Sequence, residues 1–377
     1  MEKRLIYFDN AASTPMSEGV IAAVYESMRA VYGNPSSVHE QGRRARVLVE
    51  QARRSIAKLL RVSPGEIIFT SGGTEANNAI LRGCCLDLGY RHFITSRLEH
   101  PAVLKCLEAL QDSGDAEVHY VDLESNGHIK LEHLAELLAQ YFGSLVSLMH
   151  ANNETGNLLP VNAVSALCRK HKALFHSDTV QTIGKFDVDF SALGMDFAAA
   201  SAHKFHGPKG VGFMFVRSGH FFEPFIKGGG QERNMRAGTE NIHGIVGMAK
   251  ALEEAHESMT EDMKHIKSLK TDCMHLLKQH IPGIGFHGDA EGSSLHTILN
   301  IFLPEGIDAE MLLPALDIEG ICVSAGSACA SGVSKGSHVL AAMGADGNRP
   351  SLRVSFSRYN TPDEVTKLVD VLKRVVC

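Results

Sequence analysis

The chain has 377 residues, an ordinary proportion of apolar side chains and a formal net charge of −6. This length can bury a full core without staples, and the slight negative charge gives no indication of direct nucleic-acid binding. No apolar run is long enough to cross a membrane, and Asp9 arrives before a signal-peptide core could form. We therefore expect a soluble, cytoplasmic protein without a membrane partner.

Alternating strand and helix patterns fill residues 43–216. Five arginines between Arg43 and Arg54 are interpreted as the solvated face of one helix. Apolar β-type runs predict strands at 66–70, 91–95, 117–121, 144–149, 173–177, 196–200 and 211–216. Helices are expected between most of them, at 74–88, 101–113, 130–140 and 161–171. This alternation predicts an α/β fold with a mostly parallel sheet covered by helices on both faces.

A long helical region at 240–280 precedes a change of pattern, with shorter elements at 295–302, 308–319, 350–355 and 361–375. The last helix has a clear start, because Thr361 can cap it, Pro362 fits its first position and Glu364 completes a capping box. We predict a large domain at 13–256 and a smaller α+β domain formed by 1–12 and 257–377.

Three motifs follow predicted strands. In TSGGTEANN (70–78), Gly72 and Gly73 precede a helix whose N-terminus could bind phosphate, although a plain strand–helix turn explains the motif equally well. In HSDTVQTIGK (176–185), Asp178 could pair with a pyridinium nitrogen, but alone it is better explained as a cap or turn. In SAHKFHGPKG (201–210), Lys204 follows a small-residue strand, which favours covalent attachment of a carbonyl cofactor over a surface lysine.

The eight cysteines include no C-x-x-C pair, so a zinc or thioredoxin-like motif is not expected. Most of them, including Cys84 and Cys85, are interpreted as small buried hydrophobic residues. Cys329 differs because it lies in SAGSACASG (324–332), whose composition is typical of an accessible loop. It could be a nucleophile, but an incidental cysteine explains an isolated motif of this kind better.

Four further places carry polar side chains, each with a structural alternative. His100 follows a predicted strand and could stack on a flat cofactor, Asn153 could bind a ring substituent, and Arg353 could clamp a substrate carboxylate. A structural histidine, a turn and a surface arginine are the alternatives. The loop GGGQERNMRAGTEN (228–241) is typical of a phosphate or subunit contact, or else of a flexible linker.

Together these segments resemble the NifS/IscS-type cysteine desulfurases, which are aminotransferase-like enzymes of fold type I that use pyridoxal 5'-phosphate (PLP). The likeness runs from FDNAASTP (8–15) and YGNPSSVHEQGR (32–43) to the last helix, and SAHKFHGPKG, RAGTEN and SAGSACASG occur in the family's order. It implies a seven-stranded sheet in the large domain and a mobile cysteine loop at 324–337 in the small one.

The resemblance also implies the roles of individual residues. It implies that Lys204 carries PLP, that Cys329 accepts sulfur from L-cysteine, and that alanine is released. His100 would stack on the ring and assist proton transfer. The remaining cofactor contacts would come from Gly73, Thr74, Asn153, Asp178, Gln181, Ser201 and His203, with Thr239 reaching the partner subunit's phosphate. The substrate carboxylate would be held by Asn34 and Arg353.

The same resemblance implies a homodimer that passes its persulfide to a sulfur acceptor, such as an iron-sulfur scaffold or a tRNA-thiolation enzyme. No resident metal is expected, apart from transient ligation of an iron-sulfur cluster by Cys329. Two alternatives remain open at this point. One is a selenocysteine lyase or another PLP-dependent lyase or aminotransferase, which need not use Cys329. The other is a sulfur-relay scaffold without turnover.

Overall fold

The computed structural model describes residues 5–307, 309–325 and 336–376. Its main feature is a seven-stranded sheet in the order β2-β8-β7-β6-β5-β3-β4, in which only β8 runs antiparallel to its neighbours. The strands are β2 (Ile67–Thr70), β3 (His92–Thr95), β4 (Glu117–Tyr120), β5 (Leu145–Ser147), β6 (Leu174–Asp178), β7 (Phe197–Ser201) and β8 (Gly212–Val216). Each predicted run overlaps one of them, so the predicted mostly parallel sheet is confirmed.

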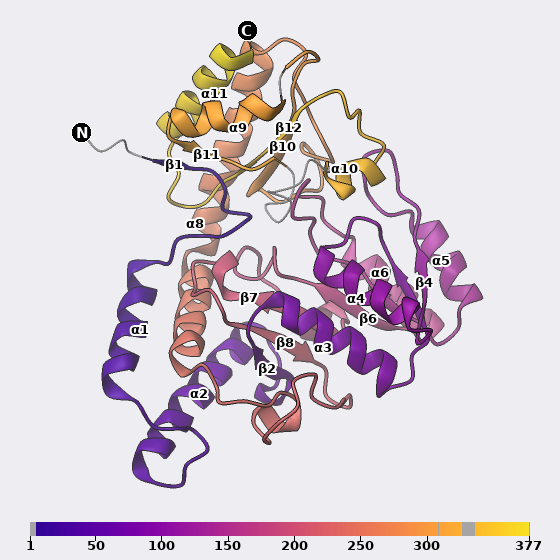
Figure 1. Cartoon of the computed structure of the whole chain (residues 1–377), viewed down its shortest axis with the longest axis vertical. Coiled ribbons are helices and arrows are strands. Elements are labelled where there is room, and N and C mark those ends of the chain that lie inside the picture. Colours follow the sequence, from indigo (N-terminus) through magenta and orange to yellow (C-terminus); the bar gives the residue numbers. More distant parts are fainter. Residues whose placement is uncertain (1–4, 308, 326–335, 377) are drawn as a thin grey trace.

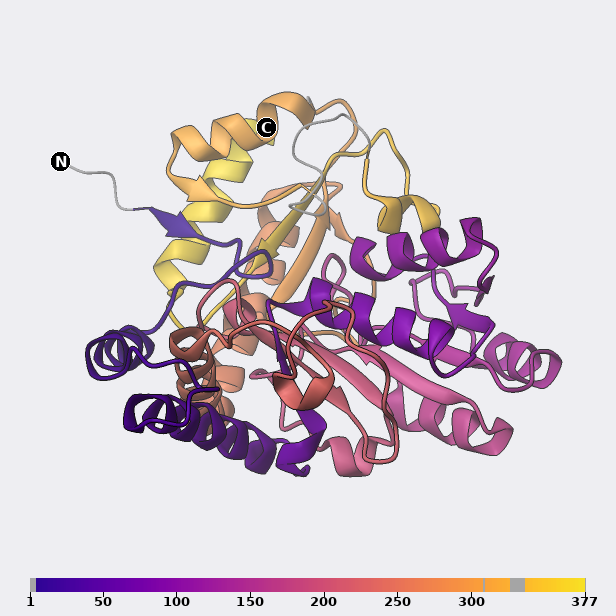
Figure 2. The same ribbon diagram turned by 60° about the horizontal axis from the view of Figure 1, so that its bottom comes forward.

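Helices cover both faces of this sheet (Figures 1 and 2). On one face lie α3 (Gly73–Leu86) and α4 (Pro101–Asp112). The other face carries α1 (Glu18–Ala30), α2 (Glu40–Leu59), α5 (Leu131–Gln140), α6 (Val161–His171) and the short α7 (Phe190–Leu193). The first three residues of β2 are all apolar because both faces of the strand are covered: Ile67 and Phe69 point into one core and Ile68 into the other.

The C-terminal part of the chain packs around a hydrophobic core of its own. An antiparallel sheet has the order β12 (Ser351–Ser355), β10 (Ile298–Phe302), β9 (Gly285–Phe286), and β1 (Ile6–Tyr7) pairs in parallel with β11 (Ile321–Cys322). The accompanying helices are α9 (Ala309–Ile318), α10 (His338–Ala342) and α11 (Pro362–Val376). The predicted capping box of α11 is present, because Glu364 N donates to Thr361 Oγ1 at 3.3 Å and Thr361 N donates to Glu364 Oε2 at 3.2 Å.

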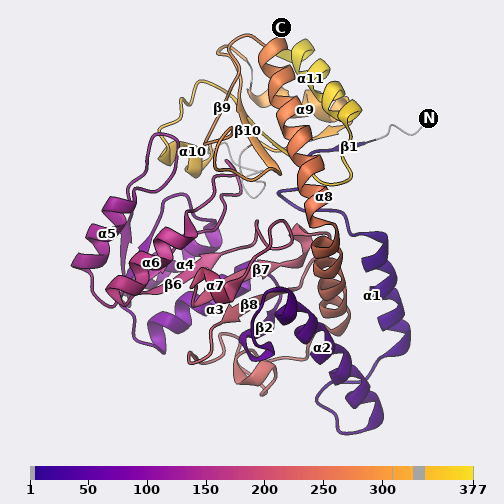
Figure 3. The ribbon, with the colours of Figure 1, turned by 180° about the vertical axis from the view of Figure 1, so that it is seen from behind.

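The 39-residue helix α8 (Ile242–His280) joins the two parts (Figure 3). Its residues up to Leu252 pack in the core of the large sheet, whereas those from Ile266 onward pack with β10, β12 and α11. Phe8 also packs in this second core. We propose the domain division at 256 and 257 because the exposed middle of α8 separates these two cores.

The expected solvated face of α2 is wrong at Arg53. This side chain is 2 % exposed and makes two hydrogen bonds to Glu232, of 2.9 and 2.8 Å. Glu232 belongs to a short 3₁₀ turn (Glu232–Asn234) within the glycine-rich segment 228–241, so at this point the segment is anchored. Arg53 is buried because a carboxylate distant in sequence offers it a bidentate partner.

In the described residues, no helix has both the length and the apolar composition that crossing a bilayer requires.

Candidate active site

A cavity of about 480 Å³ opens at the carboxyl ends of β6 and β7, between the large sheet and β12. Ligand sites of open α/β sheets lie at such ends. Many of the residues predicted for the site line this cavity: Gly73, Thr74, His100, Asn153, Asp178, Gln181, Ser201, His203, Lys204 and Arg353. They come from six separate segments of the chain, which the fold brings together.

Asp178 ends β6 and its carboxylate is held by two donors. Asn77 Nδ2 donates to Oδ2 at 2.7 Å, and Val180 N donates to Oδ1 at 3.0 Å. Behind it, Asn77 Oδ1 lies 3.1 Å from His176 Nε2, and His176 Nδ1 lies 2.9 Å from Ser147 Oγ. Burial lowers the pKa of His176 to about 3, so this ring is neutral and orients Asn77 without adding charge. The carboxylate is therefore fixed in the cavity and has lone pairs left for a ligand.

Lys204 lies in the 3₁₀ turn Ala202–Lys204 directly after β7. Its Nζ donates to the carbonyl oxygens of Ala11 and Ala12, at 2.7 and 2.8 Å. The amine is thus aimed into the cavity by main-chain atoms of the N-terminal segment. Its neighbour Lys185 is half-buried, and loss of solvent around its amine lowers the pKa of that lysine to about 7, with Lys204 and Arg353 acting in the same direction. Lys185 Nζ donates to Gln181 Oε1 at 3.0 Å.

The glycine turn before α3 forms one wall of the cavity. A Cβ on Gly73 would lie 2.5 Å from Val180 Cγ2, and Gly72 has φ +151°, so larger side chains would not fit here. The side chain of Glu75 stabilises the turn. Its Oε2 accepts a hydrogen bond from Ser71 N at 2.8 Å, and its Oε1 accepts one from Arg236 Nε at 2.9 Å. Burial raises the pKa of Glu75, but these partners outweigh it and hold the pKa below its usual value.

Two imidazoles line the cavity. His100 is the N-cap of α4, and its Nδ1 accepts a hydrogen bond from Ala102 N at 3.1 Å. Burial lowers its pKa, although the nearby Asp178 carboxylate acts in the opposite direction. His203 Nδ1 lies 3.3 Å from Ser13 Oγ, and burial together with Lys204 lowers the pKa of His203 to about 4. Both rings are therefore held mainly neutral.

Arg353 reaches the cavity from β12. It is 1 % exposed, and its two terminal nitrogens donate to Asn153 O and to Asp9 Oδ1, both at 2.9 Å. Its Nε has no hydrogen-bond partner in the described part of the chain. A guanidinium has five N–H donors, so donors remain for a carboxylate. The predicted surface alternative for Arg353 is wrong.

Two predicted site residues, Asn34 and Thr239, do not line the cavity of this single chain. Asn34 is exposed in the turn before α2, and Thr239 is exposed in the segment 228–241. Cys329 lies outside the described residues. The isolated cysteines Cys84 and Cys85 are buried, as predicted.

Sequence reasoning missed several polar residues of the site. Asn77 lies within TSGGTEANN (70–78), and His176 is the first residue of HSDTVQTIGK (176–185), two positions before Asp178. Their position near the motif glycines and near Asp178 is the feature of the sequence that could have identified them as site residues. For Lys185 and Glu99 the sequence holds no such signal, because only the fold shows that Glu99 is buried and Lys185 half-buried next to cavity residues.

These residues fit PLP. The first turn of α3 and Ser201 offer phosphate donors, Asp178 offers a fixed carboxylate for the ring nitrogen, and Lys204 offers an amine, all around one cavity. The hydrogen-bond donors match the phosphate, the Asp178 carboxylate is an acceptor for a protonated pyridine nitrogen, and the Lys204 amine matches the aldehyde of that cofactor.

The chain belongs to the aminotransferase class-V family, whose sequence model matches residues 6–368. Among individual proteins, it is 38 % identical over 382 residues to the cysteine desulfurase IscS of Dictyoglomus turgidum, covering 99 % of this chain and 95 % of that protein. It is 40 % identical over 380 residues to the putative cysteine desulfurase IscS 1 of Bacillus subtilis, covering 98 % and 99 %. A solved structure named NifS-like protein superposes with a TM-score of 0.92, at 39 % identity and 99 % coverage of each chain.

Proposed function

We propose that this chain is a PLP-dependent cysteine desulfurase, which converts L-cysteine to L-alanine and keeps the sulfur as a persulfide on Cys329. The observation that carries the proposal is the placement of Lys204 and Asp178 in one cavity with the N-terminal turn of α3. Full-length similarity to proteins named cysteine desulfurases supports this reaction over other class-V chemistry.

The cofactor, when bound, draws electrons from the substrate α-carbon. Lys204 Nζ would hold it covalently, and once released by the substrate the same amine is placed to take the proton from the α-carbon. Asp178 would pair with the ring nitrogen, and Gln181 and Asn153 would contact the opposite side of the ring. His100 would stack on the ring. Gly73, Thr74, Ser201 and His203 would bind the phosphate.

Arg353 selects an amino acid by binding its carboxylate, assisted by Asn34. The three unused donors of Arg353 and its burial support this assignment. A buried guanidinium discriminates strongly against substrates without a carboxylate, because its donors would then be left unpaired.

The sulfur step needs a nucleophile. The thiolate of Cys329 attacks the sulfur of the bound substrate, a sulfur–sulfur bond forms, the carbon–sulfur bond breaks, and the electron pair returns to carbon. Protonation then gives L-alanine. The persulfide is passed to an acceptor protein, such as an iron-sulfur scaffold or a tRNA-thiolation enzyme, in the cytoplasm.

Substitution of the two reacting groups tests the proposal. Cys329→Ala should keep the visible absorption of bound PLP but lose persulfide formation and alanine release. Lys204→Ala should lose the covalent cofactor link and reduce turnover by at least about 10²-fold. Borohydride reduction followed by peptide mapping checks the link, and mass spectrometry of the Cys329 peptide checks the persulfide.

Cys322→Ala is the matched control, because Cys322 is a partly exposed thiol on β11 and should leave both readouts unchanged. Alanine production by Cys329→Ala at the parental rate would rule out the sulfur step. Unlabelled Lys204 would rule out the whole function.

We propose further that the enzyme is a homodimer in which Thr239 reaches the partner subunit's phosphate. Support comes from an exposed apolar surface on α1 and the turn after it, formed by Ile21, Tyr25, Met28, Tyr32 and Val38. Ile21, Tyr25 and Met28 recur at helical spacing and therefore share one face of α1, and exposed apolar faces are typical of protein interfaces.

A further inference from the structure

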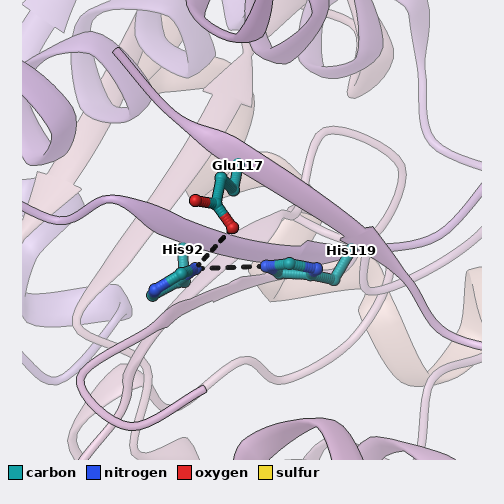
Figure 4. Close-up of side chains that lie close together, drawn as sticks. All are labelled: His92, Glu117 and His119. Atoms are coloured by element: carbon teal, nitrogen blue, oxygen red, sulfur yellow. Dashed lines mark hydrogen bonds and ion pairs between the residues drawn. The ribbon is translucent and has the colours of Figure 1, made fainter. Parts of the chain in front are cut away.

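The outer edge of the large sheet holds a second cluster of ligand-type side chains. His92 begins β3, and Glu117 and His119 lie on the neighbouring edge strand β4 (Figure 4). The strands are parallel, and His92 is in register with Glu117. Because residues two apart on a strand point to the same side, the pairing places all three side chains on one face of the sheet.

This cluster is remote from the cofactor cavity. Strands β3 and β4 run in the same direction as β6 and β7, since every pair between them is parallel. The cavity lies at the carboxyl ends of β6 and β7, whereas His92 and Glu117 stand at the first residues of their strands. The two places are therefore at opposite ends of the sheet.

The separations between the ligand atoms match a metal site. His92 Nδ1 lies 3.2 Å from His119 Nε2 and 3.5 Å from Glu117 Oε2, and the three ligand atoms all lie within 4.8 Å of one another. In a tetrahedral site with bonds of about 2.0–2.1 Å, two ligand atoms are about 3.3–3.4 Å apart. Small rotations of these side chains would therefore bring all three onto one ion.

The positions of the two rings are already restricted. The ring of Tyr141 stacks on His119, with centroids 3.6 Å apart and an interplanar angle of 14°, and its centroid lies 5.0 Å from that of His92. Both imidazoles are half-buried, while Glu117 is exposed. Because the two imidazoles are already held in place, little conformational entropy is lost when an ion binds. The exposed carboxylate of Glu117 makes the site accessible to an ion from solvent.

We propose that His92, Glu117 and His119 form a binding site for Zn²⁺, with three protein ligands and one position open to water. Two imidazoles and one carboxylate are a donor set that zinc prefers, whereas Ca²⁺ and Mg²⁺ need more oxygen ligands than this edge offers. Among the residues that the structure describes, this is the one group of three or more such side chains with suitable spacing.

The test uses the full-length, PLP-loaded protein carrying Cys329→Ser, because the thiol of Cys329 would itself bind zinc. Calorimetric titration with Zn²⁺ should show one ion per chain. His92→Ala and His119→Ala should each weaken binding at least about tenfold, and Glu117→Gln should weaken it less. Should loss of the ring stacked on Tyr141 disturb folding, His119→Phe serves as a second variant, because it keeps an aromatic ring but offers no ligand atom.

His133→Ala is the matched control. His133 is a half-buried histidine on α5 whose Nδ1 lies 3.5 Å from Asp122 Oδ2, without the three-ligand spacing. The His133→Ala variant should bind Zn²⁺ with the same affinity as the parent protein. Since an ion that binds only the folded state stabilises it, Zn²⁺ should also raise the thermal midpoint of the parent and of His133→Ala but not of His92→Ala.

In the Cys329-containing protein, His92→Ala should desulfurate cysteine at the parental rate, which separates this site from the cofactor cavity. The proposal is overturned if the parent binds no Zn²⁺ at micromolar concentrations. It is equally overturned if the His92, Glu117 and His119 variants bind as tightly as the parent.

Discussion

The carboxyl group of Glu99 illustrates how burial sets charge beside the cofactor cavity. Glu99 is 1 % exposed, and its Oε1 accepts hydrogen bonds from Ser96 Oγ at 2.9 Å and Met149 N at 3.0 Å. Its Oε2 has no partner in the described ranges. Burial raises the pKa of Glu99 to about 8, despite the opposite effect of these donors. The group therefore keeps its proton at neutral pH, directly before His100.

Glu99→Gln should remove the part of the pH dependence of the free energy of unfolding that comes from ionisation of Glu99. In the parent, the folded state retains the Glu99 proton between pH 4.5 and about 8 while the unfolded state releases it. Stability then falls as pH rises through that window, and the loss is complete above it. The neutral amide cannot titrate, so the parent should lose stability relative to Glu99→Gln from pH 5 to pH 8. Urea midpoints at four pH values measure this.

The matched control for Glu99 is Glu257→Gln, because Glu257 is exposed on α8. Its difference from the parent should not vary with pH in the same way. A constant difference between the parent and Glu99→Gln would show that Glu99 ionises normally in the folded protein.

At the level of elements, helix α10 is attached to the large domain by its first residues. Ser337 Oγ caps α10 by accepting from Leu340 N at 3.1 Å, and it also donates to the buried carboxylate of Glu154. In the next residue, His338, the ring atom Nε2 lies 3.0 Å from the carbonyl oxygen of Glu99. Glu154 and Glu99 adjoin the cavity residues Asn153 and His100, so α10 contacts the segments that shape the cavity.

Ser337→Ala should destabilise the protein by about 1 kcal/mol through loss of the cap, and further because Glu154 loses its donor. The same change should have a smaller effect in a Glu154→Gln background, because the two residues share one interaction. Urea unfolding of the four proteins measures the coupling. Ser125→Ala, at an exposed turn, is the control, and equal midpoints for Ser337→Ala and Ser125→Ala would contradict the expectation.

For the whole molecule, the relation of the two domains depends on the exposed middle of α8. Arg353 comes from the small domain, and Lys204 and Asn153 come from the large one, yet they line one cavity. Between the two buried halves of α8, Thr260 is exposed in the helix interior. The helix thus connects the core that carries Arg353 with the core that carries Lys204.

Thr260→Pro should disturb this relation. Proline in a helix interior costs about 3 kcal/mol or more and kinks the helix. We expect a raised KM for L-cysteine with the absorption of bound PLP retained, because the cofactor contacts lie mostly in the large domain. Steady-state kinetics and the visible spectrum measure the two effects. Thr260→Ala should keep the parental KM, and a parental KM in Thr260→Pro would show that α8 does not set this geometry.

The proposed homodimer can be tested separately. Tyr25→Glu combined with Met28→Glu places two charges in the exposed apolar surface of α1 and should convert a dimeric parent to monomers. Analytical ultracentrifugation gives the masses. Met311→Glu, at an exposed position of α9, is the control and should leave the dimer intact. A monomeric parent would refute the proposed role of Thr239.

The sequence by itself determined the sheet and much of the site, because both depend on local patterns. Apolar runs of strand length located all seven strands, and residues placed directly after strands, such as Asp178 and Lys204, had to lie at one edge of a parallel sheet. The glycines before α3 were recognisable for the same local reason.

Only the tertiary structure decided which distant groups meet. Arg53 pairs with Glu232 across 179 residues, and Lys204 reaches the carbonyl of Ala11 across 193. Such partners depend on the order of the strands and on the return of the N-terminal segment to the sheet. Local pattern fixes where a side chain stands on its own element, but burial and charge pairing depend on what packs against it, and that is a property of the whole fold.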